Sequence, residues 1–200
     1  SSDLFKKVKE WGLKNVCLLE PQNKGDLGAA IMNQEIQNVL NPKASDKPEV
    51  SIGHKRVVRV GDRLMQLKNK PEYEIFNGMV GTVTDCFVSP TKNFREDTIT
   101  VQFDDGVEHT YAREDFDMIQ LAYAMTIHKT QGSEYKCSIM LADGHHEFMV
   151  RKRLIYTGWT RNKNELFIVG QKNMIAHALR NKETERNTML SDLLQQYLVL

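Results

Sequence analysis

The spacing of hydrophobic residues changes twice along the chain and divides it into three blocks. In the first block, residues 1–52, the apolar run Val16–Leu19 is typical of a buried strand. A short helix is predicted before this run, over Leu4–Trp11. A longer helix is predicted after it, because apolar side chains recur at the 3.6-residue period up to Asn41-Pro42. The apolar face of the longer helix consists of Met32, Ile36, Val39 and Leu40.

Residues 53–118 change to short segments in which apolar and polar side chains alternate, as in strands with one buried face. Thr98–Phe103 is the clearest example, and Val107–Tyr111 returns after the turn Asp104–Gly106. Asn77-Gly78 marks another turn. Several short strands joined by tight turns predict a small β barrel.

Residues 119–200 return to an α/β pattern. Cys137–Ala142 and Leu166–Val169 are continuous apolar runs typical of buried parallel strands, and Glu147–Thr157 between them is predicted to be a helix. The chain is therefore predicted to be an α/β domain with a parallel sheet that is interrupted by a β insert. A last helix is predicted from an apolar stripe of Leu190, Leu193, Leu194 and Tyr197.

Composition places the chain among ordinary soluble proteins and limits the ways in which it can bind nucleic acid or a membrane. It has 200 residues, of which 40% are hydrophobic and 26% charged. The 27 basic and 26 acidic residues give a net charge of +1, so any contact with nucleic acid must come from local patches. No apolar run approaches the ~20 residues of a membrane span, and no contact with a membrane is expected.

The three cysteines, Cys17, Cys86 and Cys137, are far apart and lie in apolar runs. This pattern predicts buried, reduced thiols in a cytoplasmic protein. The N-terminus has no signal-peptide pattern, and a helical pattern already begins at Leu4, so we expect a segment of a longer chain.

The first candidate for chemistry is the segment Ala122–Tyr135, in which an apolar stretch runs into Thr, His, Lys, Gln and Glu residues around Gly132. Polar side chains of this kind suit contacts with phosphates and bases. A glycine allows a ligand to approach the backbone closely. From these residues alone, a solvated helix start with an incidental histidine explains the segment equally well.

The second candidate is Leu154–Lys163, where Arg161 ends a predicted helix just before a buried strand. From this position an arginine can reach across a cleft between domains, and its planar fork of donors suits a phosphate in transition. An arginine that caps the helix C-terminus and interacts with its dipole is an equally good interpretation.

Three weaker candidates favour structural interpretations. Val101–Asp105 resembles a strand that ends in two magnesium-binding acids, but the glycine and returning strand that follow favour a hairpin tip. His145–Glu147 has no further ligands at metal-binding spacing. Arg151–Arg153 is typical of a solvated helix face, with contact to DNA phosphates as the alternative. The sequence contains no G-x-x-x-x-G-K-[ST] phosphate loop.

Taken together, the two main candidates are more specific. The order Thr126–Glu134, followed by Tyr156–Arg161, resembles motifs V and VI of superfamily 1 helicases. The ending Gln131–Glu134 is similar to that of the RecD-like branch, whose members move 5′ to 3′ along DNA. The pattern departs from motif VI at Gly158 and Trp159, where Ala and an aliphatic residue are usual, and at Asn162, where Ala is usual.

The resemblance extends over nearly the whole chain. Leu18–Pro21, Met32–Gln37 and Leu40–Pro42 are similar to the segment that opens the second RecA-like domain of this family. Gly61–Gln66 and Asn77–Gly81 resemble the family's SH3-like insert. The resemblance implies a second RecA-like motor domain in two parts, residues 1–52 and 119–200, with an SH3-like β barrel at 53–118.

The resemblance also implies roles for individual residues. Arg161 would be the catalytic arginine finger, and Gly132 and Glu134 would face ATP beside it. Single-stranded DNA would be the partner, and Mg²⁺ would be held by the missing N-terminal motor domain, with no metal ligand in this chain. DNA repair or recombination is the expected setting. The residues expected along the DNA are Thr126, His128, Lys129 and Thr160.

Two other readings compete with a helicase segment that is inactive by itself. The chain could be a catalytically silent module that binds nucleic acid or protein through the barrel, in which case no phosphate loop would lie upstream. It could also belong to a helicase of the Pif-like or conjugative relaxase type. Those proteins usually lack an acid at the position of Glu134, which argues against them.

Overall fold

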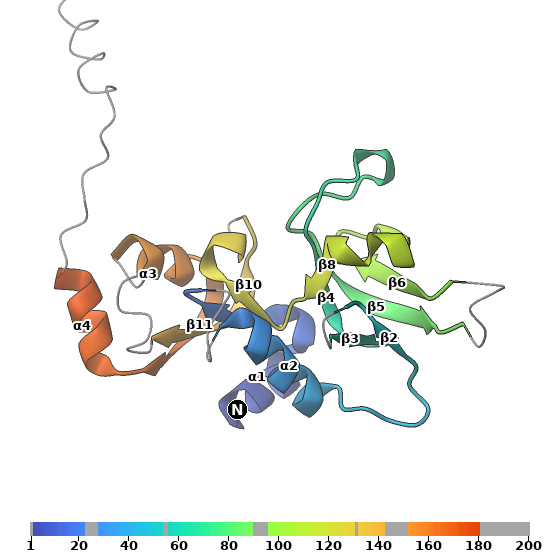
Figure 1. The fold of residues 1–200 in the computed structure, drawn as a ribbon. Coiled ribbons are helices and arrows are strands. Elements are labelled where there is room, and N and C mark those ends of the chain that lie inside the picture. Colours follow the sequence, from blue (N-terminus) through green and yellow to red (C-terminus); the bar gives the residue numbers. More distant parts are fainter. Residues whose placement is uncertain are drawn as a thin grey trace, which may run out of the picture.

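A computed structural model describes residues 2–22, 28–53, 56–89, 96–130, 132–142 and 152–180. Figure 1 shows two main bodies, an α/β part built on a parallel sheet and a part built on antiparallel strands. The helices are α1 (Ser2–Trp11), α2 (Ala29–Leu40), α3 (Lys152–Trp159) and α4 (Lys172–Arg180). Short 3₁₀ helices are η1 (Leu13–Asn15), η2 (Pro71–Tyr73), η3 (Arg113–Met118) and η4 (Ile127–Thr130).

The parallel sheet has four strands and is covered by helices on both faces. Its order is β11 (Asn162–Gly170), β10 (Tyr135–Ala142), β1 (Val16–Glu20) and β9 (Ala124–Thr126). Alternate residues of β1 enter different cores. Leu18 packs in the core that includes α1 and α2, and Leu19 packs in the core that includes α3 and α4. Burial on both faces explains the continuous apolar runs of β1 and β10, and the predicted parallel pairing is confirmed. The predicted burial of 166–169 is wrong, because β11 is the edge strand, with its apolar residues half-buried and Val169 exposed.

The inserted part is an antiparallel sheet with a small hairpin beside it. Within β6 the buried residues alternate with half-exposed ones, as predicted. The turn at Asp104–Gly106 joins β6 to β7, with Gly106 at φ 101°, so the hairpin-tip interpretation is confirmed. The sheet order is β7 (Glu108–Ala112), β6 (Thr98–Phe103), β5 (Val80–Phe87), β4 (Arg63–Gln66) and β8 (Ile119–Leu121). The hairpin consists of β2 (Glu49–Ser51) and β3 (Val57–Arg59).

Several elements differ from the sequence prediction. The strands β8 and β9 were not predicted, and β8 joins the antiparallel sheet just beyond residue 118. The helix α4 was also not predicted, although it packs Ala178 into the core. The helix stripe at 190–197 lies outside the described residues. The domain boundaries at 52 and 118 stay a prediction.

The expectation for the cysteines holds in the part of the chain that the structure describes. All three cysteines are free and buried, as predicted. Burial raises the pKa of the Cys86 thiol to about 12, so this thiol stays protonated and unreactive. None of the helices in the described ranges is long and apolar enough to cross a membrane.

Candidate functional site

The two sequence segments with candidate chemistry lie next to each other in the fold. After β9, the chain forms η4 and then passes Gly132 before entering β10. The segment after α3 runs alongside this entry, and the backbone N–H of Tyr135 donates to the carbonyl oxygen of Arg161 at 2.8 Å. Residues that are far apart in the sequence therefore form one continuous surface at the start of β10 and β11.

The Arg161 side chain is held in place but keeps unused donors. Its Nε donates to the Thr157 carbonyl oxygen at 3.2 Å, and its two terminal nitrogens donate to the Ser133 carbonyl oxygen at 3.4 Å and to Thr160 Oγ1 at 3.0 Å. Arg161 therefore does cap the last turn of α3. The guanidinium carries five N–H groups, so two remain that have no hydrogen-bond partner among the described residues.

Glu134 is exposed and carries its own counterion. Its Oε2 lies 2.6 Å from Nζ of Lys163, at the start of β11. The hydrogen bond from Lys163, the charge of Lys163 and the charge of Arg161 lower the pKa of Glu134. The carboxylate is therefore ionised at neutral pH, where it can accept hydrogen bonds from hydroxyl groups. Sequence reasoning found Glu134 but missed Lys163.

Gly132 gives this surface an open stretch of backbone. Its φ is +90°, a conformation that L side chains rarely adopt. A Cβ atom built on Gly132 would have no heavy atom within 4 Å. A ligand can therefore approach the Gly132 backbone without meeting a side chain from Gly132 itself.

Three of the predicted DNA contacts lie together where β9 ends. Thr126 is half-buried at the end of the strand, and His128 is exposed on η4. Lys129 is half-buried, its Nζ donates to Gln120 Oε1 at 3.2 Å, and burial lowers its pKa. These side chains lie at the carboxyl end of a parallel strand, which is the usual place for ligands in α/β sheets.

Thr160, the fourth predicted DNA contact, lies directly after the end of α3 and not on β9 or η4. Its Oγ1 donates to the Thr157 carbonyl oxygen at 2.9 Å and accepts from Arg161. The structure thus brings Thr160 together with Arg161 at the end of α3.

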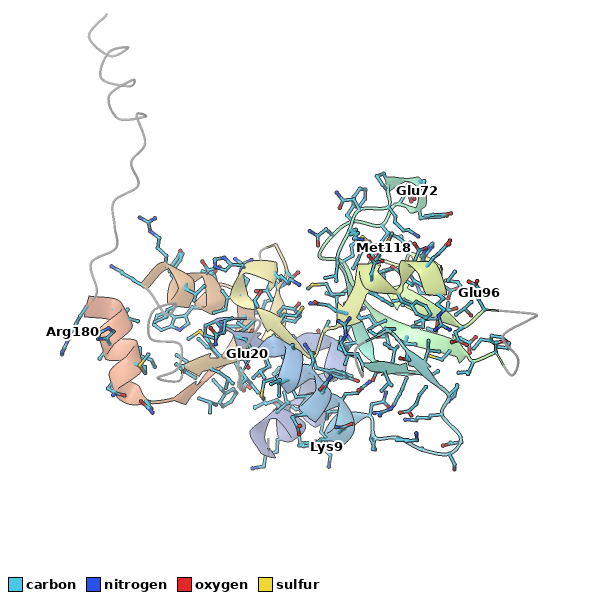
Figure 2. All side chains as sticks on the ribbon, viewed as in Figure 1. Lys9, Glu20, Glu72, Glu96, Met118 and Arg180 are labelled. Carbon is cyan, nitrogen blue, oxygen red and sulfur yellow. The ribbon has the colours of Figure 1, made fainter. Side chains whose placement is uncertain are left out.

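Glu20 is a buried acid that sequence reasoning did not single out. It ends β1 directly opposite Thr126 in the parallel register, and its side chain is fully buried. Figure 2 shows it in the α/β part of the molecule. Among the described residues, neither carboxylate oxygen has a hydrogen-bond partner, and burial raises the pKa of Glu20 to about 8. An acid at the end of an apolar strand was the signal available in the sequence.

A cleft of about 530 Å³ separates the entry of β10 from the barrel. Its walls include Gly132 and Glu134 on one side and the hairpin tip with Asp104 and Asp105 on the other. Lys14 also lines it and lies 3.7 Å from Asp104. Because three carboxylates face the cleft, a phosphate-bearing ligand would need further cations there.

Within the described ranges, no group of three His, Cys, Asp or Glu side chains is placed to hold a metal ion. The weak candidate His145–Glu147 lies outside those ranges, and so does Arg151. Lys152 and Arg153 are exposed at the start of α3.

Two family models match the chain in the order in which its parts occur. Residues 32–103 match the SH3 domain of ATP-dependent RecD-like DNA helicases. Residues 121–169 match the UvrD-like helicase C-terminal domain. The second match contains the segments of both main candidates.

Curated relatives point to the same group of proteins. The chain is 32% identical over 175 residues to the ATP-dependent RecD2 DNA helicase of Deinococcus radiodurans, which covers 88% of the chain and 23% of that relative. It is 35% identical over 74 residues to the RecBCD enzyme subunit RecD of Haemophilus influenzae, over 37% of the chain and 11% of that relative. The chain thus spans less than a quarter of the length of either.

Solved structures with a similar fold include helicases of the Pif1 type. A Bacteroides Pif1 bound to single-stranded DNA has a TM-score of 0.52 and 18% identity, over 100% of this chain and 50% of the other. A Bacteroides Pif1 in complex with ADP-AlF3 and single-stranded DNA has a TM-score of 0.54 and 18% identity, over 91% and 45%. At this identity the likeness supports the fold alone, a RecA-like α/β domain with an SH3-like insert.

Proposed function

Because the chain belongs to the RecD-like DNA helicases, we propose that it is the second motor domain of an ATP-dependent helicase that moves 5′ to 3′ along single-stranded DNA and unwinds duplex. It would be part of a longer protein, in keeping with its 23% share of the length of the Deinococcus relative. The first motor domain would supply the phosphate loop and the magnesium ligands. We further propose a cytoplasmic protein of DNA repair or recombination.

One observation carries this proposal. The arginine at the end of α3 and the loop that enters β10 share a surface, joined by the hydrogen bond from the Tyr135 N–H to the Arg161 carbonyl oxygen. The same loop begins at η4, where His128 and Lys129 lie. A single short segment thus connects the proposed nucleotide side to the proposed DNA side. A motor that converts ATP turnover into movement requires such a connection.

On the nucleotide side, the residues fit a triphosphate that another domain presents. Bound ATP would supply the phosphoryl group whose transfer to water drives movement. The two unused N–H groups of Arg161 would stabilise charge on that group, while contacts to Thr157, Ser133 and Thr160 hold the guanidinium in place. Glu134 is ionised and would accept from nucleotide hydroxyls, and the open backbone at Gly132 would allow close approach.

On the DNA side, the contacts would be few and independent of sequence. Thr126 and Lys129 can donate to phosphate oxygens, and the exposed His128 can stack on a base or bond the backbone. The chain has a net charge of only +1, so it can neutralise few phosphates. Binding by this domain alone is therefore expected to be weak and strongly reduced by salt.

The DNA assignment is tested by replacing His128 and Lys129 together with alanine in the full-length protein. Single-strand affinity is expected to fall roughly 30-fold, because one phosphate contact and one stacking contact are lost, each contributing about 1 kcal/mol. Stimulation of ATP turnover by DNA should fall as well. Fluorescence anisotropy with a labelled oligonucleotide, measured beside the melting temperature, separates the outcomes.

The matched control is Lys9→Ala on α1, which removes an exposed lysine away from η4. It should leave both affinity and melting temperature unchanged. We call Thr126, His128 and Lys129 the η4 cluster. A double variant that binds DNA normally but has a much lower melting temperature would show that the η4 cluster is structural and would refute the DNA assignment.

A further inference from the structure

A buried stripe of amide side chains runs along helix α2 at Asn33 and Gln37 and continues at Asn41, the residue that follows the helix. These positions are four residues apart, so they lie along one face of the helix. Burying amides is unfavourable unless they form hydrogen bonds, so each one needs specific partners. Those partners lie in the two segments that flank the five-stranded sheet of the barrel, residues 57–62 just before β4 and residues 122–124 just after β8.

Asn33 fixes the exit from the barrel. Its Oδ1 accepts from the backbone N–H groups of Tyr123 and Ala124 at 2.8 and 2.9 Å. Its Nδ2 donates to the carbonyl oxygens of Ala29 and Ala124, both at 2.7 Å. All four hydrogen-bonding positions of the amide are therefore used. Ala124 begins β9, so Asn33 sets the start of the strand that ends at Thr126.

Asp62 connects the entry to the exit. This fully buried carboxylate accepts from Gln37 Nε2 on α2, from Asn41 Nδ2 directly after it, and from the backbone N–H of Arg59. It also accepts from the Tyr123 hydroxyl at 2.6 Å. Both ends of the five-stranded sheet, just before β4 and just after β8, are thus tied to one helix and to each other.

A second tie lies at the far side of the barrel. Asp104, at the hairpin tip, forms a two-point ion pair with the buried Arg63 and lies 3.7 Å from Lys14 of η1. The barrel is therefore attached to the α/β part through α2 and through η1. Two separated attachments oppose rotation of the barrel better than either one does.

We propose that the amide stripe of α2, through Asn33 and Asp62, holds the barrel and β9 in one fixed arrangement, so that Asn33 and Tyr123 are positioning residues for the η4 cluster. The proposal rests on the proposed function insofar as the η4 cluster contacts DNA. Its consequence is that the barrel moves with the second motor domain as one body. A force on the barrel would then reach the DNA contacts through β9.

Asn33→Asp is the most direct test, because it keeps the shape of the side chain. A carboxylate oxygen replaces the NH2 group and cannot donate to the carbonyl oxygens of Ala29 and Ala124. Asn38→Asp, on the exposed face of the same helix, is the matched control. Tyr123→Phe is a milder second variant that removes one hydroxyl from Asp62, and Tyr73→Phe on the exposed η2 is its control.

The first readout is a distance distribution between spin labels at Lys9→Cys and Glu72→Cys in the full-length protein. Figure 2 shows these positions on the α/β part and on the barrel part. A narrow distribution is expected in the wild type and in both controls. It should broaden in Asn33→Asp and Tyr123→Phe. A distribution that stays narrow in a folded Asn33→Asp variant overturns the proposal.

The second readout is ATP turnover as a function of single-stranded DNA concentration. In Asn33→Asp, the DNA concentration for half-maximal stimulation should rise roughly tenfold, with the KM for ATP and the turnover without DNA unchanged. If the DNA response, the KM for ATP and the turnover without DNA all worsen together and the melting temperature falls, the stripe has only a structural role and the positioning proposal is wrong. If the wild type shows no DNA-stimulated turnover, the proposed function fails, while the distance measurement still decides whether the stripe holds the barrel.

Discussion

Replacing Arg161 with alanine in the full-length protein is expected to reduce ATP turnover about 10³-fold or more, because arginine fingers contribute 10³–10⁵-fold to phosphoryl transfer. ATP binding should change little, since the finger acts mainly on charge that develops in the transition state. Arg161 is also only partly buried, and its contacts are to one helix end and one neighbouring loop. The fold should therefore tolerate the change.

Two further variants serve as comparisons in this measurement. Arg161→Lys keeps the charge but loses the planar fork, so most of the loss in turnover should remain. Arg180→Ala removes an arginine at the end of α4 instead and should leave turnover unchanged. A near-normal turnover number for Arg161→Ala, from single-turnover kinetics at saturating ATP and DNA, would remove Arg161 from the mechanism.

Replacing Glu20 with glutamine is expected to stabilise the fold above pH 8 by roughly 1.4 kcal/mol for each unit of pKa shift, on the order of 5 kcal/mol in total. Burial raises the pKa of Glu20 from 4.5 to about 8. A raised folded pKa favours proton uptake on folding, so the wild type loses stability as pH rises from about 4.5 to about 8. Glutamine is neutral throughout and escapes this loss.

Urea unfolding at pH 5 and pH 8.5 tests the prediction. The gain of Glu20→Gln over the wild type should be small at pH 5 and large at pH 8.5. Glu35→Gln, on the exposed face of α2, should show no such difference between the two pH values. Equal effects of Glu20→Gln at both pH values would mean that Glu20 is ionised in the folded protein at neutral pH.

The sequence predicts the strands whose environment is uniform along their length. Residues 16–19 are buried on both sides, and residues 98–103 are buried on one side, so the hydrophobic pattern records each environment directly. The strands β8 and β9 have only three residues each, which is too short for any period to be recognised. Their positions depend instead on partners about 50 to 110 residues away.

The candidate site was predictable in its residues and less so in its geometry. Arg161 and Glu134 follow from the order of two segments in the sequence. The counterion Lys163 and the shared surface at Tyr135 depend on the parallel pairing of β10 with β11, which no local pattern reveals. The Asp62 network joins residues 21 to 61 positions apart. The burial of Glu20 likewise depends on which strands lie beside β1.

The most direct test of the central claim is DNA-stimulated ATP turnover, measured on the 200-residue chain alone and on the full-length protein. The account predicts turnover only in the full-length protein, since this chain would supply the finger and the DNA contacts but has no phosphate loop. Turnover by the 200 residues alone, abolished by Arg161→Ala, would contradict it. A full-length protein without turnover would contradict it too, and would favour a catalytically silent binding module.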